Sequence, residues 1–221
     1  MKELRGLIRS AKALLFDFDG VIKESIATKG AALQRVFRSY GEDFGDVVMQ
    51  HHIANPGMPR FEKIKLYLEI LGISDDLELK RHVRVFEESL LDAVVNSVWV
   101  PGVPEFLEIA SKKKLMFVLT AAPQYEIDEI LKRLDLSSKF HQIYGFPTKK
   151  ESAMSLIMNK TGLLPSDLVM FGDSVPDYNA AQRMKIPFIY RLSESSPADA
   201  RANNGMQACI CDFKGLIDVF E

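Results

Sequence analysis

Short apolar runs alternate with helical patterns along much of this 221-residue chain, and no other feature restricts its possible folds as much. The runs are bounded by turn residues and have the length of buried parallel strands. They lie at residues 12–17, 115–120, 167–171, 186–190 and 207–211. The helical patterns between them lie at residues 103–112, 123–134, 151–161 and 176–184. We therefore expect an α/β fold with a doubly wound, Rossmann-like parallel sheet.

Residues 25–95 have a different pattern, because amphipathic stretches such as TKGAALQRVFRSYG occur there with no clear strand among them. Pro101 and Gly102, in WVPGVPEF, mark the return to the alternating pattern. The chain is long enough for one α/β domain with a smaller insertion. The sequence therefore predicts an α/β core of residues 1–24 and 96–221, with an inserted helical domain of residues 25–95.

The composition argues against several classes of protein. Apolar residues make up 47% of the chain, charged residues 26%, and the formal net charge is only -2. We therefore expect neither a general nucleic-acid binder nor a disordered acidic protein. No stretch reaches the about 18 apolar residues of a membrane-spanning helix, and the first residues lack a signal-peptide cleavage site. These features predict a cytoplasmic protein without membrane association; nothing in the sequence indicates an oligomeric state.

Two carboxylates follow the first apolar run, in LLFDFDGVIKES, where Asp17 and Asp19 precede Gly20. The glycine permits a sharp turn, and we expect open backbone amides of that turn to face an anion. The carboxylates suit a hard cation, or a division of labour between a nucleophile and a general acid. A capped turn after a strand would explain the same pattern. Lys23 and Glu24 lie where the chain leaves for the helical insertion. Either residue could belong to a hinge or to the rim of the substrate site.

A second acidic pair follows another predicted strand, in MFGDSVPDYNAA, which contains Asp173 and Asp177. Open parallel sheets bind ligands at the carboxyl ends of their strands. Several carboxylates gathered there would repel one another unless a divalent cation joined them. We therefore expect a metal site that includes these residues with Asp17 and Asp19. Asp177 also fits a favourable charge at a helix N-terminus, and both roles are compatible.

Two further features suit a phosphate group. Thr120 ends the run LMFVLT, and the small residues and proline after it lead into a helix, so that a hydroxyl and amides are available. Lys149 and Lys150 precede another helix and offer a cation to balance a phosphoryl group. Each feature alone has an ordinary explanation, because threonine is common at strand ends and lysines at helix starts are usually solvated. The two Cys residues, Cys209 and Cys211, fit a strand as ordinary small apolar residues.

These four elements, in this order, resemble the motifs of the haloacid dehalogenase superfamily of phosphotransferases, and the match spans the whole core. The chain is similar to the phosphoglycolate phosphatase and β-phosphoglucomutase-like subgroup, which has an α-helical cap. The matching motifs are Asp17-Phe18-Asp19-Gly20-Val21, FVLT ending at Thr120, the run that opens at Lys150, and the segment from Gly172 to Asp177. Lys149 remains an alternative to Lys150.

The resemblance implies that Asp17 attacks phosphorus and also binds the metal, which is Mg²⁺ in this family. Asp19 would protonate the leaving alcohol, deprotonate the hydrolytic water, and contact the metal through its backbone carbonyl. Asp173 would be a direct metal ligand, and Asp177 would bind the metal or orient it through water.

The remaining motif residues would bind the phosphoryl group. Thr120 and Lys150 would hold its oxygens, and Gly20 and Ala121 would contact the substrate. The family often has Asn or Gly where Ala121 stands. Because that position largely uses its backbone amide, we expect little loss of phosphate binding.

The insertion is similar to the family's mobile cap, which would exclude water and select the substrate. In HHIANPGMPRFEKIK, a group of polar residues gathers near one loop, and Arg60 is the residue that we expect to contact substrate. Solvated positions at a helix start are the alternative for Arg60 and Lys63, and incidental placement is the alternative for His51 and His52.

The predicted function is Mg²⁺-dependent hydrolysis of a small-molecule phosphomonoester, such as a sugar phosphate or phosphoglycolate, through an aspartyl-phosphate on Asp17. Asp19 argues against a dehalogenase, because the resemblance implies that dehalogenating members lack this second aspartate. A phosphomutase of the β-phosphoglucomutase type and a catalytically silent phosphate-binding module remain as alternatives.

Overall fold

A computed structural model describes residues 2–55, 58–193 and 208–220 of the chain. The chain divides into two compact units, one made of Met1–Glu24 and Val98–Glu221 and the other of Ser25–Ser97. We call these the core unit and the helical unit. Within the core unit, the Glu24 amide donates a hydrogen bond to the Val98 carbonyl at 2.8 Å. The segments that leave and re-enter the core unit are thus joined to each other.

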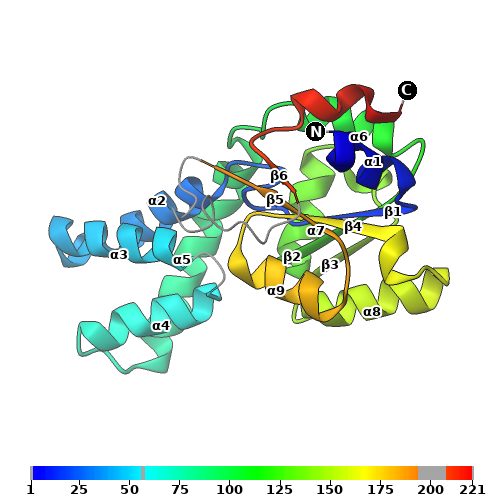
Figure 1. The fold of residues 1–221 in the computed structure, drawn as a ribbon. Coiled ribbons are helices and arrows are strands. Elements are labelled where there is room, and N and C mark those ends of the chain that lie inside the picture. Colours follow the sequence, from blue (N-terminus) through cyan, green and yellow to red (C-terminus); the bar gives the residue numbers. More distant parts are fainter. Residues whose placement is uncertain (1, 56–57, 194–207, 221) are drawn as a thin grey trace. The chain divides into compact units, whose positions relative to one another are not determined.

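The core unit is built on a parallel sheet with the strand order β3-β2-β1-β4-β5-β6 (Figure 1). The strands are β1 (Ala13–Phe16), β2 (Leu115–Pro123), β3 (Gln142–Phe146), β4 (Leu168–Gly172), β5 (Phe188–Arg191) and β6 (Cys209–Ile210). This order confirms the predicted doubly wound α/β class. β3 was not predicted, because Gln142 and Gly145 interrupt its short apolar sequence. Of the run predicted at 207–211, Gln207 lies outside the described residues.

Helices cover both faces of this sheet, α1 and α6 on one face and α8 and α9 on the other (Figure 1). Their bounds are α1 (Lys2–Ser10), α6 (Val103–Ala110), α7 (Gln124–Arg133), α8 (Lys150–Thr161) and α9 (Val175–Arg183). Short 3-10 helices lie at Ser137–Lys139, Pro165–Asp167 and Lys214–Phe220. The predicted helices agree within a residue or two, the usual uncertainty of helix ends.

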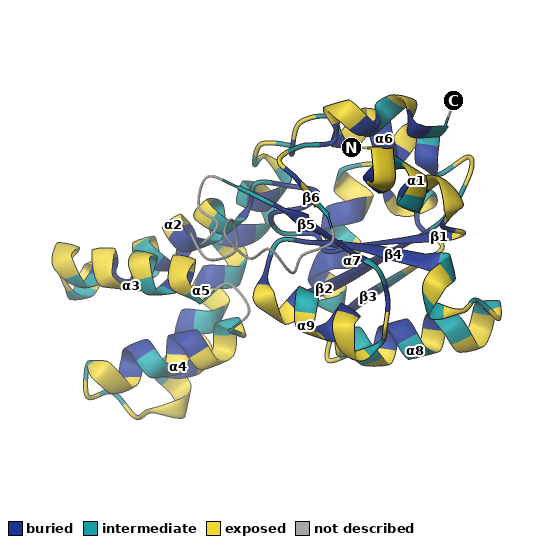
Figure 2. Cartoon of the chain, in the orientation of Figure 1, coloured by how far each residue is buried: buried dark blue, intermediate teal, exposed yellow. Residues whose placement is uncertain are grey.

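Burial on both faces of the sheet fixes the position of β1, whose residues are all buried. Leu15 belongs to the apolar cluster that includes Met154 of α8 and Ala181 of α9. On the opposite face, Phe16 stacks on Phe171 with ring centroids 5.0 Å apart. Figure 2 shows the buried strands and the exposed outer faces of the helices. The strand is therefore held in register up to Phe16, directly before Asp17.

The helical unit contains α2 (Ile26–Phe37), α3 (Glu42–Ala54), α4 (Arg60–Ile70) and α5 (Asp76–Val95), with a 3-10 turn at Arg38–Tyr40. α2 packs against α3 and α5, and α4 packs against α5. Phe37, Tyr67 and Phe86 are buried among them. The predicted helical character of the insertion is confirmed. In the described ranges, none of the helices combines the length and the apolar character needed to cross a bilayer.

Candidate active site

Two neighbouring strands deliver Asp17 and Asp173 to the same edge of the sheet. β1 and β4 run parallel with Phe16 beside Phe171, and the Asp17 amide donates to the Phe171 carbonyl at 2.9 Å. Asp17 follows β1 directly, and Asp173 follows β4. Asp177 lies in the first turn of α9, which begins directly after this strand end. The doubly wound topology therefore gathers acids that lie far apart in the sequence.

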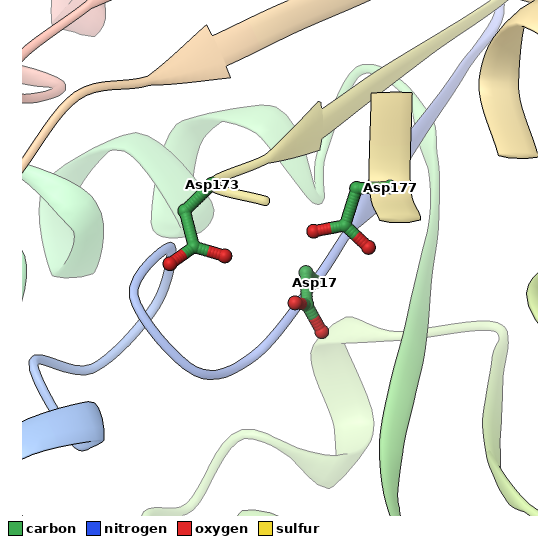
Figure 3. A group of neighbouring side chains, drawn as sticks. All are labelled: Asp17, Asp173 and Asp177. Carbon is green, nitrogen blue, oxygen red and sulfur yellow. The ribbon is translucent and has the colours of Figure 1, made fainter. Parts of the chain in front are cut away.

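One carboxylate oxygen from each of Asp17, Asp173 and Asp177 lies within 4.8 Å of the other two. Figure 3 shows the three side chains around a shared space. Asp17 and Asp177 are buried, and Asp173 is partly exposed. Oxygen ligands grouped in this way match the preference of Mg²⁺ and other hard divalent cations. The residues present therefore fit the cation that the sequence predicts.

Asp17 and Asp173 both have a raised pKa, first because they are buried and second because other carboxylates lie nearby. Burial raises the pKa of Asp17 to about 7, with added repulsion from Asp177 and Asp19 and an opposing attraction from Lys150. Burial, Asp17 and Asp177 together hold the pKa of Asp173 well above its usual value. A bound divalent cation would reverse this effect by stabilising the ionised carboxylates.

Lys150, the first residue of α8, supplies a positive charge to this group. Its Nζ lies 3.1 Å from Asp17 Oδ1 and also contacts Asp177 Oδ1. Burial alone lowers the pKa of Lys150, but the carboxylates of Asp17 and Asp177 outweigh this effect and raise it, so the lysine stays charged. Lys149 precedes the helix and has an exposed side chain. Of the two candidate lysines, Lys150 is therefore the one at the acidic group.

Two residues that received no individual role from the sequence keep Asp177 in place. Ser174 begins α9 as its N-cap, and its hydroxyl donates to Asp177 Oδ2 at 2.7 Å while accepting from the Asp177 amide at 3.4 Å. A serine three residues before an acid is a helix-start pattern that could have indicated this role. Gly172 allows the close approach, because a Cβ there would lie 2.6 Å from the Asp177 Cβ.

The turn after β1 differs from expectation. Gly20 has a left-handed φ of 74°, as its position in a sharp turn requires, but its amide donates to the Lys23 carbonyl at 2.7 Å. The next three amides all donate to the Phe18 carbonyl. The expectation of open amides is therefore wrong for these four positions, including Gly20. The group of three carboxylates does not include that of Asp19, which leaves its backbone carbonyl as the metal contact that the resemblance implies.

Thr120 and Ala121 lie near the end of β2, beside β1. The β1–β2 register places Phe16 beside Val118, so Thr120 lies at the edge of the sheet where Asp17 emerges. Its side chain is buried, and its Oγ1 accepts a hydrogen bond from the Ala122 amide at 3.2 Å. Ala121 is exposed. Contact of either residue with a phosphate stays a prediction.

Arg60 and Lys63 make their described contacts inside the helical unit. Arg60 Nη1 lies 3.5 Å from Glu87 Oε1, and its guanidinium lies 5.3 Å from the centre of the Phe86 ring. Lys63 is buried, with its Nζ 3.2 Å from His52 Nδ1. Burial favours a packing role for Lys63 and His52 over the substrate contact that the sequence left open. Substrate contact by Arg60 remains a prediction.

The chain is thus a Rossmann-like α/β protein with an inserted helical unit. At the strand ends it has an acidic group, with a lysine beside it, that fits a metal ion. The sequence profile of the haloacid dehalogenase-like hydrolase family matches residues 14–190. Because this match covers most of the chain, the chain belongs to the haloacid dehalogenase-like hydrolase family.

Several relatives carry the names of phosphatases. The chain is 32% identical over 196 residues to the phosphorylated carbohydrates phosphatase of Thermotoga maritima, covering 83% of this chain and 86% of that protein. It is 22% identical to the phosphoglycolate phosphatase of Pseudomonas putida, covering 86% of this chain and 74% of that protein.

Solved structures agree with the fold. A hydrolase of this superfamily from Geobacter sulfurreducens, subfamily IA, superposes with a TM-score of 0.68 at 17% identity, covering 96% of this chain and 97% of that one. A Thermotoga maritima structure assigned to a β-phosphoglucomutase superposes with a TM-score of 0.69 at 26% identity, covering 90% of this chain and 94% of that one.

Proposed function

We propose that this chain is a Mg²⁺-dependent phosphatase that hydrolyses a small phosphorylated carbohydrate or organic acid through an aspartyl-phosphate on Asp17. Its enzyme class, phosphoric monoester hydrolase, is the one that the family and the named relatives support. One observation carries the proposal: three carboxylates surround a shared space at the strand ends, with Lys150 in contact with two of them.

In the proposed reaction, an oxygen of Asp17 attacks phosphorus and the bond between phosphorus and the ester oxygen breaks. Asp19 donates a proton to that oxygen, so the alcohol leaves in neutral form. Water then attacks the phosphorus of the aspartyl-phosphate, Asp19 accepts a proton from the water, and inorganic phosphate leaves with Asp17 restored.

The surrounding groups orient the nucleophile and balance the negative charge of the phosphoryl group. Asp17 Oδ1 accepts from the Phe18 amide at 2.8 Å and lies 3.1 Å from Lys150 Nζ, so the nucleophile has a fixed orientation. Lys150 and Thr120 would bind phosphoryl oxygens and stabilise their charge. Mg²⁺ held by Asp17, Asp173 and Asp177 would supply the positive charge that lets a carboxylate approach a phosphate.

The substrate class is proposed from the relatives. One is named a phosphatase of phosphorylated carbohydrates, and several others are named phosphoglycolate phosphatases. The helical unit would act as the cap that excludes water and selects among such substrates.

Phosphate release from 4-nitrophenyl phosphate, followed by a panel of sugar phosphates and phosphoglycolate, tests this proposal. We expect release that requires Mg²⁺ and is lost in Asp17→Asn, which keeps the shape of the side chain but removes its charge. If no ester in the panel releases phosphate, a catalytically silent phosphate-binding module becomes the better explanation.

The similarity to the structure assigned to a β-phosphoglucomutase supports a second candidate, a phosphomutase with the same nucleophile. Incubation with a sugar 1-phosphate, followed by phosphorus NMR, separates the two. Inorganic phosphate as the main product supports the phosphatase, whereas an isomeric sugar phosphate formed faster than inorganic phosphate supports the mutase.

A further inference from the structure

Arg191, the last residue of β5, joins three separate segments of the core unit. Its side chain is only 4% exposed. Its Nε donates to the Cys211 carbonyl at 3.1 Å, and its Nη1 donates to the Gly20 carbonyl at 3.2 Å. The guanidinium therefore links the end of the sheet to the turn that carries Asp19.

The same guanidinium pairs with Glu24. Nη1 donates to Glu24 Oε2 at 3.0 Å, and Nη2 donates to Glu24 Oε1. This two-point geometry is specific to arginine, because its planar fork matches both carboxylate oxygens. Glu24 is the last residue of the core unit before the helical unit begins. Arg191 thus fixes the outgoing chain at the boundary between the units.

The outgoing chain is also held by the returning chain. The Glu24 amide donates to the Val98 carbonyl at 2.8 Å, and the Val100 amide donates to the Ile22 carbonyl at 3.1 Å. Between these bonds, Lys23 lies over the ring of Trp99, with Nζ 4.2 Å from the ring centre. All of these contacts lie within the core unit.

These contacts hold Asp19 between two anchors. On one side, the Asp17 amide is bonded to the Phe171 carbonyl of β4. On the other side, Gly20, which directly follows Asp19, is bonded through its carbonyl to Arg191. Arg191 therefore restrains the backbone directly after Asp19, although the two residues lie far apart in the sequence.

We propose that Arg191 and Glu24 form a positioning pair that fixes Asp19 for proton transfer to the leaving group. The inference rests on the proposed function, because it takes Asp19 as the general acid. Loss of the pair would release the Gly20 carbonyl and let the turn shift, while the nucleophile stays bonded to β4. Proton transfer would then suffer more than nucleophilic attack, because general acid catalysis depends strongly on geometry.

Because the pair should affect proton transfer more than nucleophilic attack, its loss should affect two substrates differently. A purely structural role would affect both substrates equally. Phenyl phosphate has a poor leaving group that needs a proton, whereas 4-nitrophenyl phosphate has a good leaving group that needs little assistance. The kcat/KM of each substrate reports the transfer of the phosphoryl group to Asp17. We expect Arg191→Met and Glu24→Gln to lower kcat/KM for phenyl phosphate by about tenfold or more, and for 4-nitrophenyl phosphate by less than about threefold.

Two further variants sharpen the result. Arg191→Lys keeps the charge but lacks the fork, so we expect it to recover only part of the loss on phenyl phosphate. Arg133→Met is the matched control, because Arg133 forms an ion pair with Glu129 at 2.8 Å on the surface of α7. We expect it to leave both substrates unchanged.

Equal loss on both substrates, or no loss on either, in a folded Arg191→Met protein would overturn the inference. Circular dichroism checks the fold, and if Arg191→Met does not fold, Glu24→Gln decides, since Glu24 is one-third exposed. Failure of the proposed function has a different signature, because the unaltered protein would then release phosphate from neither substrate with Mg²⁺ present.

Discussion

Replacing Lys150 with methionine removes the positive charge that faces Asp17 and Asp177 while keeping a similar side-chain length. The Nζ of Lys150 lies 3.1 Å from Asp17 Oδ1, and the two side chains are only 15% and 11% exposed, so water screens the pair weakly. With an effective dielectric constant of about 20, a pair at such a distance is worth roughly 5 kcal/mol. This value is the attraction within the Lys150–Asp17 pair alone, before the cost of taking both charges out of water is subtracted.

The net loss should be smaller because a carboxylate can take up a proton. The pKa of Asp17 is already raised to about 7, and loss of the lysine would raise it further. Breaking a buried ion pair costs about 3 to 5 kcal/mol, and we expect a loss of about 3 kcal/mol at pH 8 without Mg²⁺. At pH 6, where Asp17 is largely protonated, the loss should be smaller.

Urea unfolding of the metal-free protein, followed by circular dichroism at both pH values, measures this effect. Lys149→Met is the matched control, since Lys149 has an exposed side chain. We also expect kcat to fall by roughly a hundredfold in Lys150→Met, the typical loss when one group that stabilises transition-state charge is removed. The reasoning is refuted if the two lysine variants have the same stability at both pH values and the same kcat.

Three other predictions follow from the same site. Gly172→Ala should weaken Mg²⁺ binding, measured by calorimetry, because the added Cβ would lie 2.6 Å from the Asp177 Cβ; Gly6→Ala, in open space, should not. Ser174→Ala should weaken Mg²⁺ binding by about tenfold or more, since it removes the hydrogen bond to Asp177, whereas Ser111→Ala on the surface should leave it unchanged. Because burial raises the pKa of Asp17 from 3.8 to about 7, the folded metal-free protein binds more protons than the unfolded chain in this window, and its stability should fall as pH rises. The increase in melting temperature that Mg²⁺ produces should therefore be larger at pH 8 than at pH 5.5; an equal increase at both values would contradict this reasoning.

The sequence predicts the central part of the sheet well because β1, β2 and β4 are buried on both faces and read as continuous apolar runs. β3 lies at the edge of the sheet, where fewer of its side chains need to be apolar, and no such run marks it. α1 escaped prediction for a related reason, since only Leu4 and Ile8 of its residues are buried.

The site likewise contains some residues that the sequence predicts and others that it does not. Asp17 and Asp173 were predictable because each follows an apolar strand directly, and parallel strands end at a common edge. Lys149 and Lys150 are adjacent in the sequence, and the direction of α8 decides which of them reaches the acidic group. The sequence alone does not give that direction. The pairing of Arg191 with Glu24 joins residues separated by 167 positions, so only the folded chain brings it to light. Likewise, Lys63 is buried, although a charged lysine near the start of a helix suggested a solvated position.

Trapping the aspartyl-phosphate tests the catalytic account most directly. The protein would be mixed with 4-nitrophenyl phosphate and Mg²⁺, quenched during turnover and treated with borohydride, which reduces an acyl phosphate to homoserine. Trypsin cleavage after Lys12 and Lys23 releases residues 13–23, and fragmentation in a mass spectrometer distinguishes Asp17 from Asp19 in this peptide. We expect homoserine at residue 17 only, and none without substrate. Turnover with an unchanged Asp17, or with the modification at another residue, would contradict the account.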